Sequence, residues 1–397
     1  MYTGQMAKTK GWGFDTKTMD RKVRPQDDFY HYANGAWLKK NTIPPAEVRW
    51  GSFNILRHNT EKQLRAILAD MQTTKAAVGS SEQLVRDMYS SAMDLKTRNK
   101  LGTTPLAPYL KEIGAIRDRK SLLATLCALH RLGVHAPWGF GVDQDSKDSS
   151  RYILHFYQSG LGMPDRDYYL KDGTEFARVR TAYKPFVVAM FRHLGRSANE
   201  AAAAAEAVLK VETELAKMSM DKVAARDADK TSHKYPAAGL KKLAPLNWSS
   251  YFKDAGVPPV RSVIVMQPEF LKKSVALVDT LSLDEWKTYL TWQLMLYAGS
   301  HLSMPIARTN FNFYGKTLAG QKQMRAPWRR SLSVTNAVVG FALGKIYIDK
   351  HFGSEARKKM GVLVDNLFAA YEKRMTELDW MSPKTKKLAI HKLRAIS

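Results

Sequence analysis

Hydrophobic residues recur at helical spacing along most of the chain. In residues 60–71 the apolar positions lie three and four apart, which predicts a helix with one buried face made of Leu64, Ile67, Leu68 and Met71. Thr60 and Gln63 stand at the spacing of a capping box, so we expect this helix to begin at Thr60.

Other segments repeat this pattern. Ser197 with Glu200 and Ser282 with Glu285 supply capping boxes ahead of two of them, and Gly133 is expected to end another because glycine readily adopts the left-handed conformation after a helix. The further predicted helices are residues 121–132, 183–194, 197–215, 286–298 and 360–378.

Strand-like alternation is rare. Residues 152–157 and 261–266 are the candidate short strands, and prolines bracket the second. Long loops are expected around residues 135–180 and 300–330. The predicted fold is therefore mainly α, a large multi-helix body with a few short strands.

The composition is that of a globular protein, with 45% apolar and 25% charged residues among 397. The excess of Lys and Arg over Asp and Glu gives a net charge of +25, which attracts anions without specificity. The basic residues form no long block and no nucleic-acid-binding motif, so we expect no specific nucleic-acid partner. The single cysteine, Cys127, excludes an intramolecular disulfide and a Cys-rich zinc site.

No stretch of the sequence approaches the ~18 uninterrupted apolar residues of a membrane span. We therefore expect no membrane segment in this chain. The N-terminus lacks the apolar core of a signal peptide. These features favour the cytoplasm but leave the compartment unknown, since export or a periplasmic location stays open if the N-terminus is incomplete.

Catalytic motifs are missing from the sequence. None of the ten histidines precedes a glutamate, so the His-Glu-x-x-His pattern of helical zinc peptidases is absent. His58 and Glu61 lie three apart, but without a third ligand we interpret them as a surface pair. The residues by themselves predict no catalytic and no metal-binding site in this chain.

Three segments of the sequence resemble a known protein family, which suggests a function that the patterns above do not. Residues 27–57, DDFYHYANGAWLKKNTIPPAEVRWGSFNILR, closely resemble the N-terminal segment of the neprilysin and endothelin-converting-enzyme family of zinc metallopeptidases, which includes bacterial oligopeptidase O. Residues 158–170, QSGLGMPDRDYYL, are similar to a later segment of that family, and Glu212 belongs to a similar helix. A final match at residues 380–396 extends the resemblance over nearly the whole chain.

The resemblance implies that residues 27–397 form the helical N-terminal domain of such a peptidase, preceded by a flexible lead, residues 1–26. Segment 27–57 would border a chamber that admits short peptides. In the family, a thermolysin-like catalytic domain with the zinc site follows, beyond position 397. The complete enzyme would use zinc to hydrolyse short peptides, whereas this stretch alone would bind no zinc and be inactive. Its implied partners are short peptides and its own missing catalytic domain.

A second interpretation stays open. The chain could be a stand-alone helical module that binds peptides without cleaving them. The DNA sequence past codon 397 distinguishes the two, because the peptidase requires a downstream His-Glu-x-x-His.

The resemblance assigns substrate binding to Arg49 and Arg57. In the family, arginines at these positions bind the C-terminal side of the peptide, and a guanidinium holds a free carboxylate through two parallel hydrogen bonds. The alternative is that both pair with nearby acids or stack on Trp50. We interpret Arg166 and Asp167 as an ion pair, and we assign packing roles to two groups of aromatic residues, Phe29, Tyr30, Tyr32 and Trp37, and Tyr168 and Tyr169.

Overall fold

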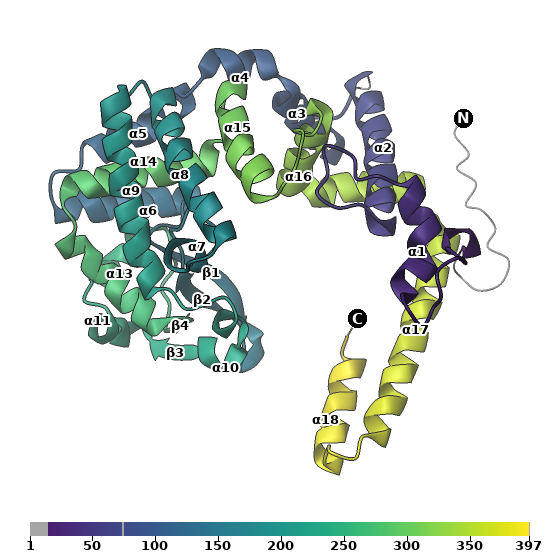
Figure 1. Ribbon diagram of the computed structural model, residues 1–397. Helices are drawn as coiled ribbons and strands as arrows, with labels where there is room; N and C mark the ends of the chain where they lie inside the picture. The colour runs from purple at the N-terminus through teal and green to yellow at the C-terminus, as the bar shows by residue number, and fades with distance from the viewer. Residues whose placement is uncertain (1–14, 74, 397) are drawn as a thin grey trace. The chain divides into compact units, whose positions relative to one another are not determined.

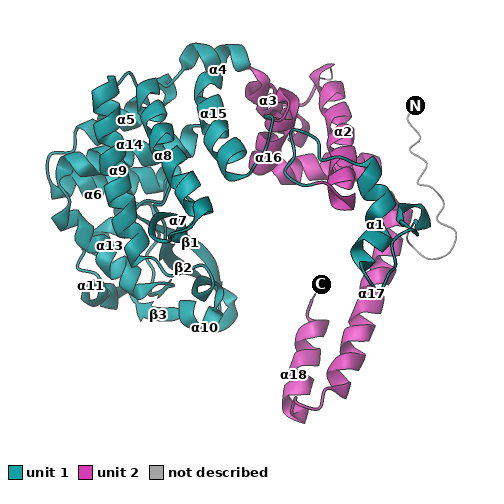
Figure 2. Cartoon of the chain, in the orientation of Figure 1, with its two compact units in different colours: residues 1–49, 95–324 teal, residues 50–94, 325–397 magenta. Residues whose placement is uncertain are grey.

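The computed structural model describes residues 15–73 and 75–396 and is mainly helical, with one small four-stranded sheet (Figure 1). The mainly α fold with a few short strands predicted from the sequence is confirmed. The chain divides into two compact units (Figure 2). Unit 1 comprises residues 1–49 and 95–324, and unit 2 comprises residues 50–94 and 325–397.

In chain order, unit 1 contains the following elements, where η marks short 3-10 helices: η1 (Thr16–Thr18), α1 (Phe29–Lys40), α4 (Leu95–Leu101), η2 (Thr104–Leu106), α5 (Ala107–Gly114), α6 (Arg119–Leu132), β1 (Trp138–Asp145), β2 (Asp148–Gln158), α7 (Asp167–Leu170), α8 (Thr174–His193), α9 (Ala198–Met218), η3 (Ala224–Arg226), α10 (Ala228–Thr231), β3 (His233–Pro236), η4 (Ala237–Gly239), α11 (Leu240–Leu243), α12 (Trp248–Asp254), β4 (Ser262–Val265), α13 (Pro268–Thr280), α14 (Leu283–Ala298), α15 (Met304–Phe311) and the π-helix η5 (Asn312–Leu318). Unit 2 contains α2 (Ser52–Thr73), α3 (Ser81–Met93), α16 (Pro327–His351), α17 (Ser354–Glu377) and α18 (Pro383–Arg394).

Helix α9 is the central helix of unit 1 and contacts α7, α8, α13 and α14. Its predicted capping box is confirmed, since the Ser197 amide donates to Glu200 at 2.7 Å and the Glu200 amide donates to the Ser197 hydroxyl at 3.3 Å. Small residues such as Ala201 and Ala205 are fully buried on this helix. They leave room for neighbouring helices to approach closely.

The sheet has the strand order β1-β2-β4-β3. Strands β1 and β2 form an antiparallel hairpin, β2 runs parallel to β4, and β3 pairs with β4 in antiparallel sense. The candidate strands 152–157 and 261–266 are confirmed within β2 and β4. The long loop expected around residues 135–180 is wrong, because β1, β2, α7 and the start of α8 occupy it. The loop expected around 300–330 is likewise largely helical, in α15 and η5.

Helix α2 differs from the prediction at its start. It begins at Ser52, and the Thr60 hydroxyl donates to the Leu56 carbonyl inside the helix, so the capping box predicted at Thr60 is wrong. The predicted apolar face is confirmed. Its members Ile67, Leu68 and Met71 are buried in the core of unit 2, which also contains Val85, Leu332, Leu343 and Ile346.

Helix α17 confirms the helix predicted near the C-terminus, but none of its residues is buried. Its apolar side chains Met360, Leu363 and Leu367 remain 48–49% exposed, and Tyr371 is 55% exposed. The amphipathic pattern therefore marks a real apolar face, which the described part of the chain leaves open to solvent.

One helix among the described residues, α16, is long and apolar enough to cross a membrane by length and composition. This finding differs from the expectation of no membrane segment. A single helix of this kind is weak evidence, because mostly buried core helices of globular proteins pass the same test, although only 22% of the apolar window of α16 is buried. Helix α16 packs against α2 and α3 through Leu332, Leu343 and Ile346.

Residues 1–14 of the predicted flexible lead lie outside the described residues. The rest of that lead contains η1 and contacts α1. The Asp20 amide donates to the Tyr32 carbonyl at 2.8 Å, and Lys39 pairs with the Asp20 carboxylate at 2.6 Å. A Cβ added to Gly35 would lie 2.7 Å from the Asp20 Cβ, so the glycine in α1 permits this close approach.

Candidate functional site

Arg49 combines an anchored backbone with a free side chain. The preceding segment is fixed inside unit 1, because the amides of Lys322 and Gln323 donate to the Pro45 carbonyl at 3.0 and 2.8 Å. The Gln321 side chain donates to the Ala46 carbonyl at 2.8 Å. Arg49 itself is exposed and has no hydrogen bond or ion pair with any residue in 15–73 or 75–396. This is the arrangement expected of a guanidinium that is available to a ligand.

Arg57 lies on α2 in unit 2 and has protein partners. Its Nε is 3.6 Å from Glu61 Oε1, one helical turn further on, and its side chain is 42% exposed. Glu61 is also bound by Arg329, whose Nε donates to Oε2 at 2.7 Å. Trp50 packs its ring edge-on against His58 at 4.7 Å. The alternative that the arginine pairs with a nearby acid therefore holds for Arg57 but not for Arg49. Substrate binding by either arginine stays a prediction.

Residues 15–73 and 75–396 contain no group of three or more His, Cys, Asp or Glu side chains that could hold a metal ion. The pair considered in the sequence, His58 and Glu61, has other contacts. His58 lies against the Trp50 ring and Glu61 accepts from Arg329. Zinc chemistry therefore has no fitting ligand set in the described part of this chain.

The most unusual polar group of unit 1 is the carboxyl of Glu212, which is fully buried on α9. Oε2 accepts hydrogen bonds from the Tyr169 hydroxyl at 2.8 Å and the Tyr183 hydroxyl at 2.7 Å. Oε1 accepts from Trp292 Nε1 at 2.8 Å and from Gln293 Nε2 at 3.4 Å. Side chains from α7, α8 and α14 thus converge on one carboxyl of α9.

Burial raises the pKa of Glu212 to about 7, because the charged form loses its hydration in the core. The hydrogen bonds from Tyr183, Tyr169 and Trp292 oppose this rise by stabilising the carboxylate. The pKa values of the neighbouring tyrosine hydroxyls are also raised. Burial and the nearby carboxyl raise the pKa of Tyr169 and that of Tyr183.

The network around Glu212 holds the loop that follows β2. The amides of Gly162 and Met163 donate to the Tyr169 hydroxyl at 3.1 and 2.9 Å. The Gly160 carbonyl accepts from the Tyr289 hydroxyl and from Gln293 Nε2, both at 2.8 Å. The QSGLGMP sequence that carries the family resemblance is therefore held on several sides by buried polar side chains.

A side chain at either glycine of this loop would overlap neighbouring atoms. Gly160 has a φ of +90°, and an added Cβ would lie 2.2 Å from the Tyr289 hydroxyl. At Gly162 an added Cβ would lie 1.8 Å from the Tyr183 hydroxyl and 3.0 Å from Glu212 Oε1. The Gly-Leu-Gly pattern thus lets the backbone approach the Glu212 network at a distance no other residue permits.

The π-helix η5 also reaches this loop. Its Tyr314 hydroxyl donates to the Gly162 carbonyl at 2.6 Å, and Phe313 stacks on Phe186 of α8 with ring centroids 4.7 Å apart. Segments of π-helix are rare and are often found at functional positions. The sequence predicted a loop here and gave no signal for this contact.

Residues 25–397 match the sequence profile of Peptidase family M13. The chain belongs to this family. Among the M13 relatives, Neprilysin-3 of Drosophila melanogaster is 29% identical over 403 residues and endothelin-converting enzyme 1 of Homo sapiens is 28% identical over 393 residues. Both matches cover 96% of this chain but only 51% and 50% of those proteins, so the chain spans about half the length of these relatives.

A solved M13-type structure shares the fold. The Mycobacterium tuberculosis zinc metalloprotease Zmp1, in complex with an inhibitor, superposes with a TM-score of 0.89 at 35% identity. The match covers 96% of this chain and 58% of that protein. The resemblance identified in the sequence is thereby confirmed as membership of the M13 family and of its helical fold.

The structure corrects two interpretations made within the M13 segments. Phe29 and Tyr30 are 68% and 61% exposed, so the packing role expected for them is wrong, whereas Tyr169 is buried as expected. Arg166 does not pair with Asp167. It donates to the Ser219 carbonyl at 2.6 Å, while Asp167 pairs with Lys171 at 3.0 Å.

Proposed function

We propose that this chain is the N-terminal, chamber-forming region of a neprilysin-like zinc metalloendopeptidase that hydrolyses short peptides. The observation that carries the proposal is the M13 match over residues 25–397, combined with coverage of about half of each full-length relative. In this proposal the zinc-binding and catalytic residues belong to the other half of the protein. The role of this region is then to bind the peptide and to enclose it.

The exposed apolar face of α17 supports the proposal. Met360, Leu363, Leu367 and Tyr371 repeat at helical spacing, yet each is about half exposed. Apolar surface of this kind favours burial against a further domain. Its presence in unit 2 is consistent with a region that is covered by more protein in the complete enzyme.

The 397-residue chain by itself is expected to bind no stoichiometric zinc and to cleave no peptide, because its described residues offer no metal-binding group. Elemental analysis of the purified chain, together with mass spectrometry of a peptide mixture after incubation, measures both. A full-length M13 enzyme treated in the same way is the positive control. One tightly bound zinc per chain, or cleavage that a chelator abolishes, would contradict the proposal.

Arg49 provides the test of substrate binding. In the full-length enzyme, Arg49→Ala is expected to raise KM about tenfold for peptides with a free C-terminal carboxylate, since a charge-assisted hydrogen bond is worth about 1.5 kcal/mol. Peptides with an amidated C-terminus should be affected much less. Steady-state kinetics on matched pairs of acid and amide peptides give both values.

Arg21→Ala is a suitable control, because Arg21 is also an exposed arginine near the N-terminus without a partner among the described residues. This substitution is expected to leave KM unchanged for both peptides. An equal rise in KM for acid and amide peptides in Arg49→Ala would remove the carboxylate role. Loss of stability in Arg49→Ala would indicate a structural role instead.

A further inference from the structure

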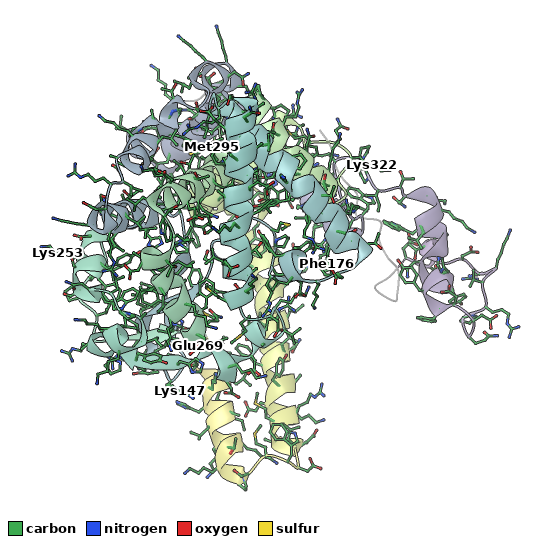
Figure 3. All side chains as sticks on the ribbon, turned by 60° about the vertical axis from the view of Figure 1, so that its left-hand side comes forward. Lys147, Phe176, Lys253, Glu269, Met295 and Lys322 are labelled. Atoms are coloured by element: carbon green, nitrogen blue, oxygen red, sulfur yellow. The ribbon has the colours of Figure 1, made fainter. Side chains whose placement is uncertain are left out.

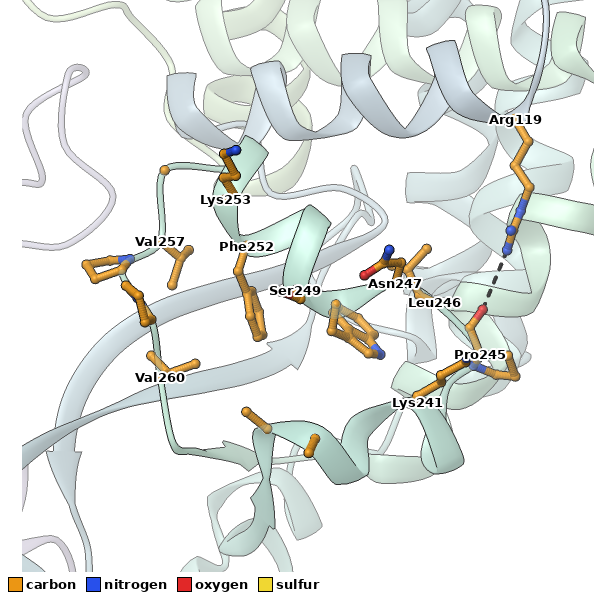
Figure 4. A pocket seen from close by; sticks show the side chains of 16 residues that line it. Arg119, Lys241, Pro245, Leu246, Asn247, Ser249, Phe252, Lys253, Val257 and Val260 are labelled. Atoms are coloured by element: carbon orange, nitrogen blue, oxygen red, sulfur yellow. Dashed lines mark hydrogen bonds between the residues drawn. The ribbon is translucent and has the colours of Figure 1, made fainter.

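Unit 1 contains a surface cavity of about 1110 Å³ that is separate from Arg49 and from the Glu212 network. It lies between α12, the turn after β3 and the loop of residues 256–260 (Figure 4). Cavities that hold small molecules usually have volumes of about 300–1,000 Å³. The size therefore suits a ligand that extends beyond a single small molecule.

The walls of the cavity are largely apolar. Phe252 lines the space between α12 and the β3 turn (Figure 4), but only 6% of this residue is exposed, so it belongs mainly to the core beneath the cavity. Val257 and Val260 lie on the facing loop, with Pro258 and Pro259 between them. Prolines restrict the backbone, so this wall is rigid.

The charged residues of the lining are all basic. They are Arg119, Lys241 and Lys253, and none of the described residues that line the cavity is an Asp or Glu. Arg119 is already engaged, with Asp279 at 2.7 Å and the Pro245 carbonyl at 3.5 Å. Lys241 and Lys253 are exposed and have no ion pair or hydrogen bond within residues 15–73 and 75–396. Figure 3 shows Lys253 at the periphery of the molecule.

We propose that this cavity binds an acidic peptide segment that carries an aromatic or large aliphatic side chain. The apolar side chain packs against Val257, Val260 and the two prolines between them, which are at least partly exposed. The flanking carboxylates pair with Lys241 on α11 and Lys253 on α12, for which the described residues supply no partner. Charge complementarity and apolar burial act together, so neither an acidic nor an apolar peptide alone binds as well. This site goes beyond the proposed peptidase function and does not depend on it.

The proposal is tested by fluorescence anisotropy with a labelled ten-residue peptide that alternates glutamate and phenylalanine. The double variant Lys241→Glu/Lys253→Glu is expected to weaken binding at least tenfold, about 1.4 kcal/mol. A peptide with serine in place of phenylalanine should bind the unmodified chain at least about fivefold more weakly. Thermal unfolding of each variant shows that the fold is retained.

Two controls separate the site from the general positive charge of the chain. Lys272→Glu/Lys273→Glu changes the net charge by the same amount on α13, outside the cavity, and should weaken binding less than twofold. Equal losses in the two double variants would overturn the proposal, as would no measurable binding of the peptide. An oligonucleotide or an anionic lipid vesicle that binds more tightly through Lys241 and Lys253 would also overturn it.

Discussion

Replacing Gly162 with alanine is expected to lower the free energy of unfolding by about 3 kcal/mol or to prevent folding, because the new methyl group overlaps buried polar atoms. Its Cβ would lie 1.8 Å from the Tyr183 hydroxyl and 2.9 Å from the Tyr183 ring carbon that carries it. Tyr183 is fully buried and cannot move without losing its hydrogen bond to Glu212. Equilibrium unfolding in urea measures the loss.

Gly114→Ala is the matched control. Gly114 is the last residue of α5 in the same unit, and nothing lies within 4 Å of a Cβ added there. Alanine at that position should be neutral or slightly stabilising, because it favours the helix. If Gly162→Ala unfolds at the same urea concentration as Gly114→Ala, the loop does not depend on the close approach seen in the structure.

Glu212→Gln should change how the stability of unit 1 depends on pH. The pKa of Glu212 is raised from 4.5 to about 7, so the folded state binds this proton more tightly than the unfolded state does. This difference stabilises the folded protein at low pH, and the contribution is lost as pH rises through 7. It amounts to about 3 kcal/mol between pH 4.5 and pH 8. The glutamine variant cannot ionise and should lack this change.

Urea unfolding of both proteins at several pH values tests the prediction through the difference in their free energies of unfolding, in which other titrating groups cancel. As pH rises, the free energy of unfolding of the unmodified protein should fall relative to that of Glu212→Gln. Glu285 is a control whose effect on stability should depend on pH in the opposite direction, because hydrogen bonds from Lys210 and Ser282 lower its pKa to about 2. Its stabilising contribution is present above pH 4.5 and is lost on acidification. A parallel pH dependence in the unmodified protein and Glu212→Gln would show that the pKa of Glu212 is the same in the folded and unfolded states.

The candidate site was only partly accessible from the sequence. The match of residues 27–57 to a family drew attention to Arg49 and Arg57. It did not show that Arg57 has partners whereas Arg49 has none among residues 15–73 and 75–396. Glu212 stood in a matching segment without an assigned role. Its four donors come from α7, α8 and α14, which are far from it in the chain, so no local pattern could assemble them.

Local sequence patterns were enough to predict the helices whose ends are set by neighbouring residues. The capping boxes of α9 and α14 and the glycine after α6 form where predicted, because their hydrogen bonds join residues only a few positions apart. The apolar face of α2 was also determined, since helical periodicity is a local property.

Features that depend on partners far away in the chain could not be predicted from local sequence. Strand β1 contains two glycines and two aspartates, which disfavour a strand, and it exists through its pairing with β2. The periodicity of α17 predicted an apolar face but could not say whether anything covers it. The ionisation of Glu212 is likewise set by burial and by donors brought from three other helices, and burial is a property of the assembled fold rather than of any one segment.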